Sequence, residues 1–144
     1  MAMKPPKMTQ YGDYAKWINF TVMANYSVRL IITDDLTKSG KARLGKGPKE
    51  NSDAFCSHIT GEGMSYLFLR HDSTESTVAH ECWHIVYRMF NWCGVQDFED
   101  ELTAYHISYL VEKVYEFKNA VKSSTKKEVS DDQPVSGASG KKSD

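Results

Sequence analysis

Two histidines and a glutamate stand close together near the middle of the chain. His80, Glu81 and His84 form a His-Glu-x-x-His sequence within residues 77–86. On an α-helix, side chains four positions apart project from the same face, so the two imidazoles can bind one divalent ion. Glu81 can then reach a water bound to that ion. Zinc is the usual occupant of such a site because it accepts nitrogen ligands and keeps one tetrahedral position open for water.

A third ligand is needed, because two histidines alone make an incomplete zinc site. The short connection 92–96 favours an antiparallel helix beside the first one, and that helix begins with several acidic residues. Any of these acidic residues could be present simply because the helix dipole favours negative charge in the first turn. We select Glu101, because the small residue Ala104 on the same side lets the two helices approach closely. Asp97 and Asp100 are the next candidates, followed by His106.

Flanking residues predict the helix that carries the motif. The segment 72–75 (Asp-Ser-Thr-Glu) is typical of a capping box, and Cys93-Gly94 predicts an end near Asn91. Uncharged residues surround the motif, as expected for a helix packed on a sheet. We therefore interpret Cys82 as a packing residue and not as a ligand.

Hydrophobic patterns predict one helix and three strands before the motif. Apolar residues spaced three and four apart indicate a helix at 10–25. Runs rich in β-branched and apolar residues indicate strands at 26–33, 53–60 and 64–70, the last two joined by a glycine turn at 61–63. The strand at 64–70 leads into the motif helix, so an exposed edge there would bind an extended peptide by backbone pairing.

The remaining segments set the domain boundaries. Residues 34–50 read as a glycine-rich loop without the spacing of a phosphate-binding loop. We expect a flexible leader at 1–9, one domain at 10–120 that ends with a helix from about 97 to 118, and a disordered polar tail at 121–144. The predicted fold class is α+β: an N-terminal helix, a small three-stranded sheet, the motif helix and a second metal-ligand helix.

Composition narrows the classes of partner. The 144 residues are 40% hydrophobic and 12% aromatic with a net charge of -1, which favours one folded domain and disfavours nucleic acid or an anionic membrane as partner. No run approaches the roughly 18 apolar residues of a membrane span. The N-terminus lacks a secretory signal and there are three cysteines, so we expect free thiols in the cytoplasm. Oligomeric state is left open.

The motif over 80–84, followed by Glu-x-x-Ala-Tyr over 101–105, resembles the gluzincins. More narrowly, it is similar to the small minigluzincin metallopeptidases and to short phage-encoded chains of this type. Tyr87 and Phe90 stand where a metzincin would need glycine and histidine, which excludes that class. The resemblance implies a minimal zincin fold in which Glu81 is the general base and Zn²⁺ is held by His80, His84 and Glu101.

The resemblance also implies a reaction, the hydrolysis of a peptide bond in a peptide or protein substrate. Zinc lowers the pKa of its water toward ~7, and Glu81 takes a proton as this water attacks the carbonyl carbon. Glu81 then delivers the proton to the leaving amine. A second donor to the oxyanion is usual, and the candidates by proximity in sequence are Tyr105, His106 and Tyr109.

Two other functions compete with hydrolysis. One is a non-catalytic zincin-like module that binds a protein, such as a phage protein that acts on a host factor in the host cytoplasm. The presence of Glu81 argues against it, because a structural site needs no base. The other is a small helical scaffold in which the motif is accidental and other polar groups satisfy the two histidines.

Overall fold

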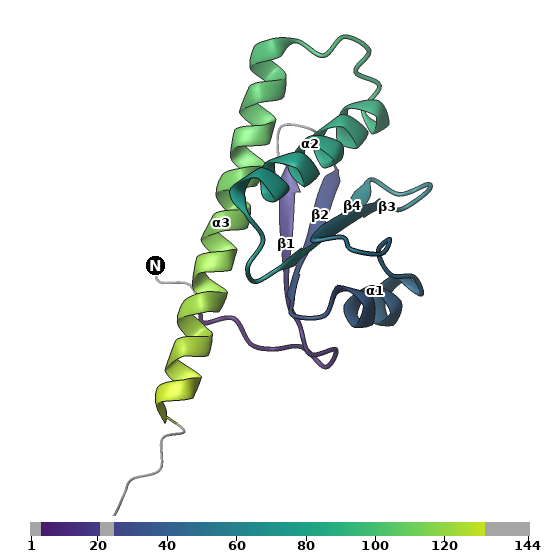
Figure 1. Ribbon diagram of the computed structural model, residues 1–144. Coiled ribbons are helices and arrows are strands. Elements are labelled where there is room, and N and C mark those ends of the chain that lie inside the picture. Colours follow the sequence, from purple (N-terminus) through teal and green to yellow (C-terminus); the bar gives the residue numbers. More distant parts are fainter. Residues whose placement is uncertain (1–3, 21–24, 132–144) are drawn as a thin grey trace, which may run out of the picture.

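Four strands form one mixed sheet in the order β1-β2-β4-β3 (Figure 1). β2 and β4 run parallel, whereas β1 and β3 each pair antiparallel with their neighbour. The computed structural model describes residues 4–20 and 25–131. The strands are β1 (Tyr14–Phe20), β2 (Tyr26–Thr33), β3 (Ala54–His58) and β4 (Met64–Arg70).

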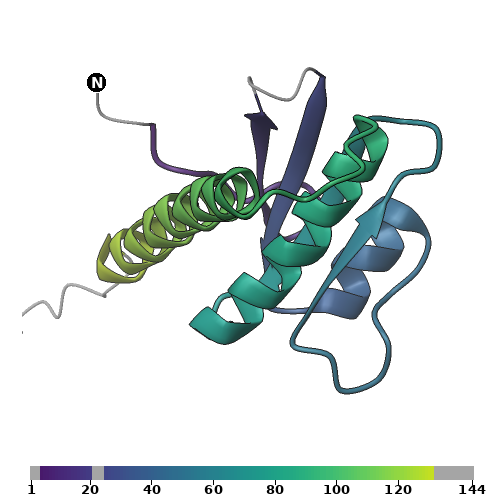
Figure 2. The same cartoon turned by 90° about the horizontal axis from the view of Figure 1, so that it is seen from above.

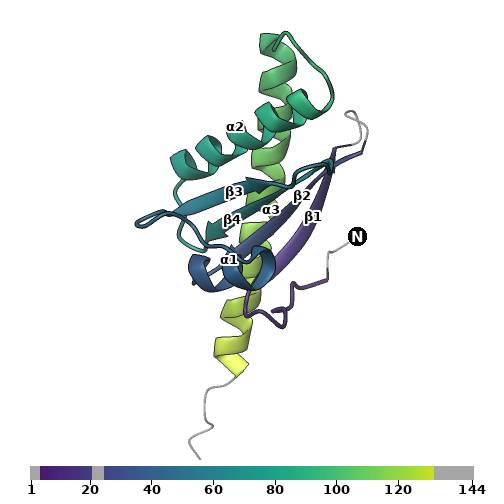
Figure 3. The same cartoon turned by 90° about the vertical axis from the view of Figure 1, so that its right-hand side faces the viewer.

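Within the described residues, three helices cover the two faces of the sheet. They are α1 (Leu36–Leu44), α2 (Glu75–Trp92) and α3 (Asp100–Asp131). Figure 3 shows α2 and α3 on one face and α1 on the other. Seen from above in Figure 2, α2 lies between α3 and the β3 side of the sheet. In the described part of the chain, no helix is long and apolar enough to cross a bilayer.

Alternation along the central strands explains why both faces are covered. Leu30 and Ile32 belong to the main core under α2 and α3, whereas Ile31, between them, packs with Leu36 of α1 and with Phe68. Successive side chains on a strand point to opposite faces, so a run that is apolar at every position needs cover on both sides. The fold class is therefore α+β as predicted, with a four-stranded mixed sheet instead of a three-stranded one.

The prediction of a helix at 10–25 is wrong, because residues 14–20 form β1. Tyr14 and Ile18 are buried and lie four positions apart, a spacing that places two residues on one side of a helix and also on one side of a strand. Phe20 is buried too, and Trp17 is 46% exposed. The buried side chains at 18 and 20 are two positions apart, which is the spacing of a strand and not of a helix. Residues 21–24 lie outside the described residues.

The segment 34–50, predicted to be a loop, contains α1. Asp35 caps its start by accepting a hydrogen bond from the backbone N–H of Lys38, and Gly45 ends it with a φ of 74°. Both are ordinary boundary residues for a helix. Few apolar side chains lie between them, so the hydrophobic pattern alone carries no helical signal.

The elements around the motif agree with the sequence. β2 and β4 have the predicted bounds, the strand predicted at 53–60 is β3, and β3 and β4 form the expected antiparallel hairpin. The capping details of α2 differ. Its N-cap is Thr74, whose hydroxyl oxygen accepts from the Thr77 N–H, and Glu75 is the first helical residue instead of the third. Cys93 and Gly94, which has a φ of 75°, end the helix as predicted.

α3 begins and ends later than predicted. It runs from Asp100 to Asp131, so the predicted end near Lys118 is wrong and residues 121–131 of the predicted tail are helical. Val121 is fully buried, and the Ser124 hydroxyl donates to the Pro6 carbonyl at 3.0 Å. These contacts hold the helix to the rest of the molecule. Residues 132–144 lie outside the described residues.

Candidate active site

His80 and His84 lie one turn apart on α2, and both are exposed. Their Nε2 atoms are 3.1 Å apart. A tetrahedral ion with Zn–N bonds of about 2.0–2.1 Å separates two nitrogen ligands by about 3.3–3.4 Å. The two nitrogens therefore need to move apart by only a few tenths of an ångström to bind one ion. Imidazole nitrogen is also a common ligand for zinc.

The opposite side of α2 is its core side. Val78, Cys82 and Ile85 are fully buried against the sheet. Burial raises the pKa of the Cys82 thiol to about 12, so this side chain stays protonated and inert at neutral pH. Cys82 is therefore a packing residue, as predicted, and it lies on the other side of the helix from the two imidazoles.

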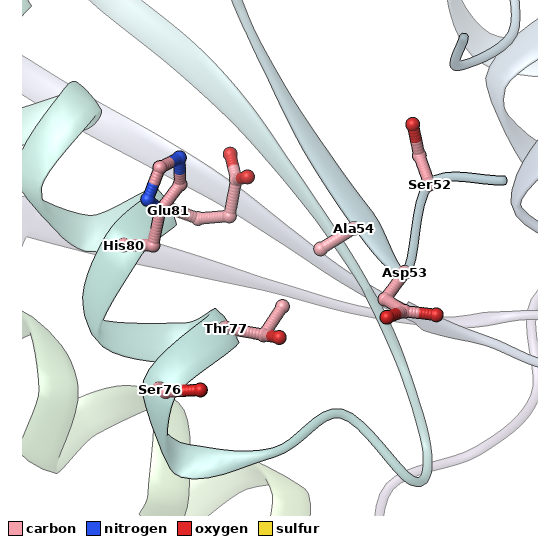
Figure 4. Close-up of a pocket in the computed structure, with 7 residues that line it drawn as sticks. All are labelled: Ser52, Asp53, Ala54, Ser76, Thr77, His80 and Glu81. Carbon is pink, nitrogen blue, oxygen red and sulfur yellow. The ribbon is translucent and has the colours of Figure 1, made fainter. Parts of the chain in front are cut away.

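Glu81 faces a hollow between α2 and the start of β3. This first hollow is lined by residues from both elements and from the segment before β3: Ser52, Asp53, Ala54, Ser76, Thr77, His80 and Glu81. In Figure 4, the Glu81 side chain extends from the helix toward the side of the hollow formed by residues 52–54. The carboxylate and the His80 imidazole thus share one open region of the surface.

A second hollow adjoins the first at Glu81. It is lined by Lys46, Gly47, Pro48, Lys49, Ser52, Ala54, Phe55, Cys56, Ser57, Glu81, His84 and Arg88. Burial and the neighbouring Glu81 carboxylate raise the pKa of the Cys56 thiol to about 12. Glu81 therefore lies where the two hollows meet, between the histidine pair and β3.

β3, and not β4, is the free edge of the sheet beside this site. The prediction that the strand at 64–70 offers an exposed edge is wrong, because β4 pairs with β2 on one side and with β3 on the other. A strand with two partners has no free backbone groups for a peptide. Among the described residues, β3 pairs with β4 alone and packs against α2. Residues of β3 line both hollows.

The structure does not bring Glu101 to the histidine pair. Among residues 4–20 and 25–131, no group of three or more His, Cys, Asp and Glu side chains is placed to hold an ion. Phe98 packs against Tyr87 and Phe90, at centroid distances of 5.3 and 5.4 Å, and so holds the start of α3 near the last turns of α2. The histidines lie in the middle of α2, and Glu101 is exposed.

The packing between the helices also differs from the predicted one. Ala104 is exposed and does not form a close approach between α2 and α3. His106 and Leu110 are buried instead, and the His106 ring contacts Phe90 of α2 at 5.4 Å. The carboxylates of Asp97 and Asp100, which could replace Glu101 as a ligand, are exposed near the start of α3.

The three predicted oxyanion donors do not line either hollow. His106 is 1% exposed, and its Nδ1 lies 2.7 Å from the Leu102 carbonyl oxygen, to which it donates. The Tyr109 hydroxyl donates to the Asn19 carbonyl at 3.0 Å, and its ring packs on Phe20. These two residues hold α3 against β1. Tyr105 is 58% exposed on α3.

Arg88 and two lysines are site residues that sequence reasoning missed. Arg88 follows His84 by four positions on α2, and this repeat of the motif spacing could have identified it. Lys46 and Lys49 precede β3 in the chain, and only the folding of this segment over the second hollow brings them to the site. Their positions depend on tertiary structure that no local pattern encodes.

Comparison with known proteins identifies no family for the chain. No protein-family model, curated protein or solved structure matches it. The likeness to gluzincins therefore rests on the residues of the two motif segments, 80–84 and 101–105, and on their chemistry.

Proposed function

We propose that this protein hydrolyses peptide bonds with a zinc ion held by His80 and His84. The observation that carries this function is the 3.1 Å separation of the two Nε2 atoms, with Glu81 directly beside them in an open hollow. A bound divalent ion supplies a polarised water and a Lewis acid for the substrate carbonyl. A pair of imidazole nitrogens suits zinc better than magnesium or calcium, which prefer oxygen ligands.

Glu81 acts as general base and then as general acid. It takes the proton of the attacking water and returns it to the nitrogen of the leaving amine. Its half-buried position between the helix and β3 supports this role, since it places the carboxylate in the same hollow as the His80 imidazole. The Cys56 thiol beside it remains protonated at neutral pH and adds no second negative charge.

Glu101 remains the proposed third ligand. Its place in the exposed first turn of α3 allows this turn to move toward the histidines when the ion binds. The packing of Phe98 must then adjust, because it holds this end of α3 near Tyr87. NMR tests this movement: addition of zinc should shift the resonances of the Tyr105 side chain, which lies one turn after Glu101.

The substrate in this proposal is an extended peptide that pairs with the outer edge of β3. A free strand edge offers backbone donors and acceptors at regular intervals, so it binds peptides with little regard for their side chains. Glu81 lies at the junction of the two hollows along this edge, where it faces a bond of the bound peptide. The free thiols of all three cysteines agree with action in the cytoplasm.

Zinc content and hydrolysis of a peptide library by the full chain test the function together. One bound zinc per chain and cleavage that depends on Glu81 support it. Zinc binding without cleavage of any peptide favours the non-catalytic binding module. If neither zinc nor any other transition metal binds, the motif is accidental.

A further inference from the structure

The second hollow concentrates positive charge beside Glu81. Besides His84, its lining includes Lys46, Lys49 and Arg88, whereas the first hollow contains no basic side chain other than His80. In the described part of the chain, none of these three cations forms an ion pair. Glu81 is the one acidic residue in the lining of the second hollow. The two hollows on either side of Glu81 thus differ in charge.

The two lysines lie on a segment whose path is fixed by close packing. Gly40 of α1 has no room for a side chain, since a Cβ there would be 2.6 Å from the Lys46 carbonyl oxygen and 2.9 Å from Phe55 Cζ. Gly47 approaches the backbone of Thr37 in the same region. This contact between α1 and the segment before β3 holds Lys46 and Lys49 at the hollow.

Arg88 comes to the hollow from the other side, on α2. Its charge acts across the α2–β3 boundary, since burial and the Arg88 guanidinium together lower the pKa of His58. It also opposes the rise in the pKa of Tyr26. Arg88 lies one helical turn beyond His84 and lines the same hollow of about 430 Å³ as Lys46 and Lys49.

We propose that the second hollow binds a carboxylate of the peptide, so that peptides with an aspartate or glutamate side chain next to the cleaved bond are preferred. Guanidinium groups bind carboxylates through two parallel hydrogen bonds, and the two lysines that line the same hollow add positive charge. A cavity of this size has room for one acidic side chain and the adjoining backbone. The preference in cleavage rests on the proposed function, whereas the binding of a carboxylate in the hollow does not depend on it.

Binding of paired peptides to the full chain without added metal tests this subsite. The probes are fluorescent hexapeptides with blocked ends, in which one glutamate moves along an alanine–leucine background, each paired with a glutamine version. We expect glutamate to improve affinity roughly fivefold over glutamine at one or two adjacent positions, and added salt to reduce the gain. Glutamine peptides with a free C-terminal carboxylate form a second arm, because a chain terminus carries the same chemistry.

Three variants locate the effect. Arg88→Gln and the double variant Lys46→Gln/Lys49→Gln should each remove most of the glutamate preference, and Arg88→Lys should restore part of it. Lys113→Gln is the matched control, because this lysine pairs with Glu116 on α3 and does not line the hollow. Circular dichroism of each variant confirms that it remains folded. Lys113→Gln should retain the full preference.

The outcomes separate the subsite from the proposed function. Two results overturn the subsite even if peptides are cleaved. One is equal binding of glutamate and glutamine peptides at every position, together with equal binding of free and blocked C-termini. The other is a glutamate preference that is unchanged in Arg88→Gln and in the double lysine variant. An Arg88-dependent preference for a free terminus assigns the carboxylate to the end of the chain. Selective binding without cleavage by the zinc-loaded protein supports the subsite and counts against hydrolysis.

Discussion

The Nε2 atoms of His80 and His84 lie 3.1 Å apart on the exposed side of α2. This separation is set by the helix itself, which is capped by Thr74 and packed on the sheet through a continuous apolar side. The two imidazoles are therefore already close enough to share the proposed ion. A preformed pair reduces the entropy that is lost when an ion orders its ligands.

The first prediction concerns the third ligand. Glu101→Ala should weaken zinc affinity by roughly tenfold or more, because it removes the proposed charged ligand, whereas Asp100→Ala should change it far less. Competition with a chromogenic chelator measures both affinities. The two variants remove the same charge from the same helical turn, so equal effects would mean that Glu101 is not the ligand.

The second prediction separates a core role of His106 from a metal role. His106→Ala should cost roughly 2–4 kcal/mol of unfolding free energy, because it opens space between Phe20 and Phe90. Its zinc stoichiometry should equal that of the wild type. Tyr105→Ala, at a neighbouring exposed position, is the control and should change stability by less than about 0.5 kcal/mol. Loss of zinc from His106→Ala while it remains folded would contradict this assignment.

The third prediction concerns stability at low pH. Asp13 is fully buried and accepts two hydrogen bonds from Arg43, at 2.7 and 2.9 Å. Burial by itself would raise the Asp13 pKa, but the hydrogen bonds from Arg43, Thr9 and Ser39 outweigh it and hold the pKa below its usual value. A carboxylate with a lowered folded-state pKa stabilises the protein above its unfolded-state pKa, and this contribution is lost as pH falls through the folded value.

Asp13→Asn tests this assignment. At neutral pH it should cost roughly 3–5 kcal/mol, since it leaves the Arg43 guanidinium without its counter-ion in a buried position. Urea unfolding at a series of pH values should show the difference from the wild type shrinking as pH falls below about 4. A difference that stays constant down to pH ~2 would mean that Asp13 is not the titrating group.

Local sequence signals account for the centre of the fold. The apolar run in 64–70, the glycine turn and the capping residues around α2 are each short-range features, and each predicts its element. β1 resembles a helix in sequence because a spacing of four fits a helix and a strand alike, and pairing with β2 resolves the ambiguity. α3 extends to Asp131 because tertiary contacts at Val121 and Ser124 outweigh the polar composition of this segment.

The candidate site also combines features that local sequence predicts with features that depend on tertiary packing. The helix alone fixes the relation of His80, Glu81 and His84, so the sequence is sufficient to place them together. The edge strand, the carboxylate from α3 and the cations of the second hollow depend on how distant segments pack. Arg88 is the exception, since it repeats the four-residue spacing of the motif.

The most direct test compares the wild type with Glu81→Gln, both loaded with zinc, for hydrolysis of a peptide library analysed by mass spectrometry. Elemental analysis of the same samples should give about one zinc per chain in each, because Glu81 is not a ligand. The wild type should cleave peptides, and Glu81→Gln should be slower by about a hundredfold or more. Equal cleavage by both proteins, or zinc-loaded wild type that cleaves nothing, would contradict the proposed hydrolysis.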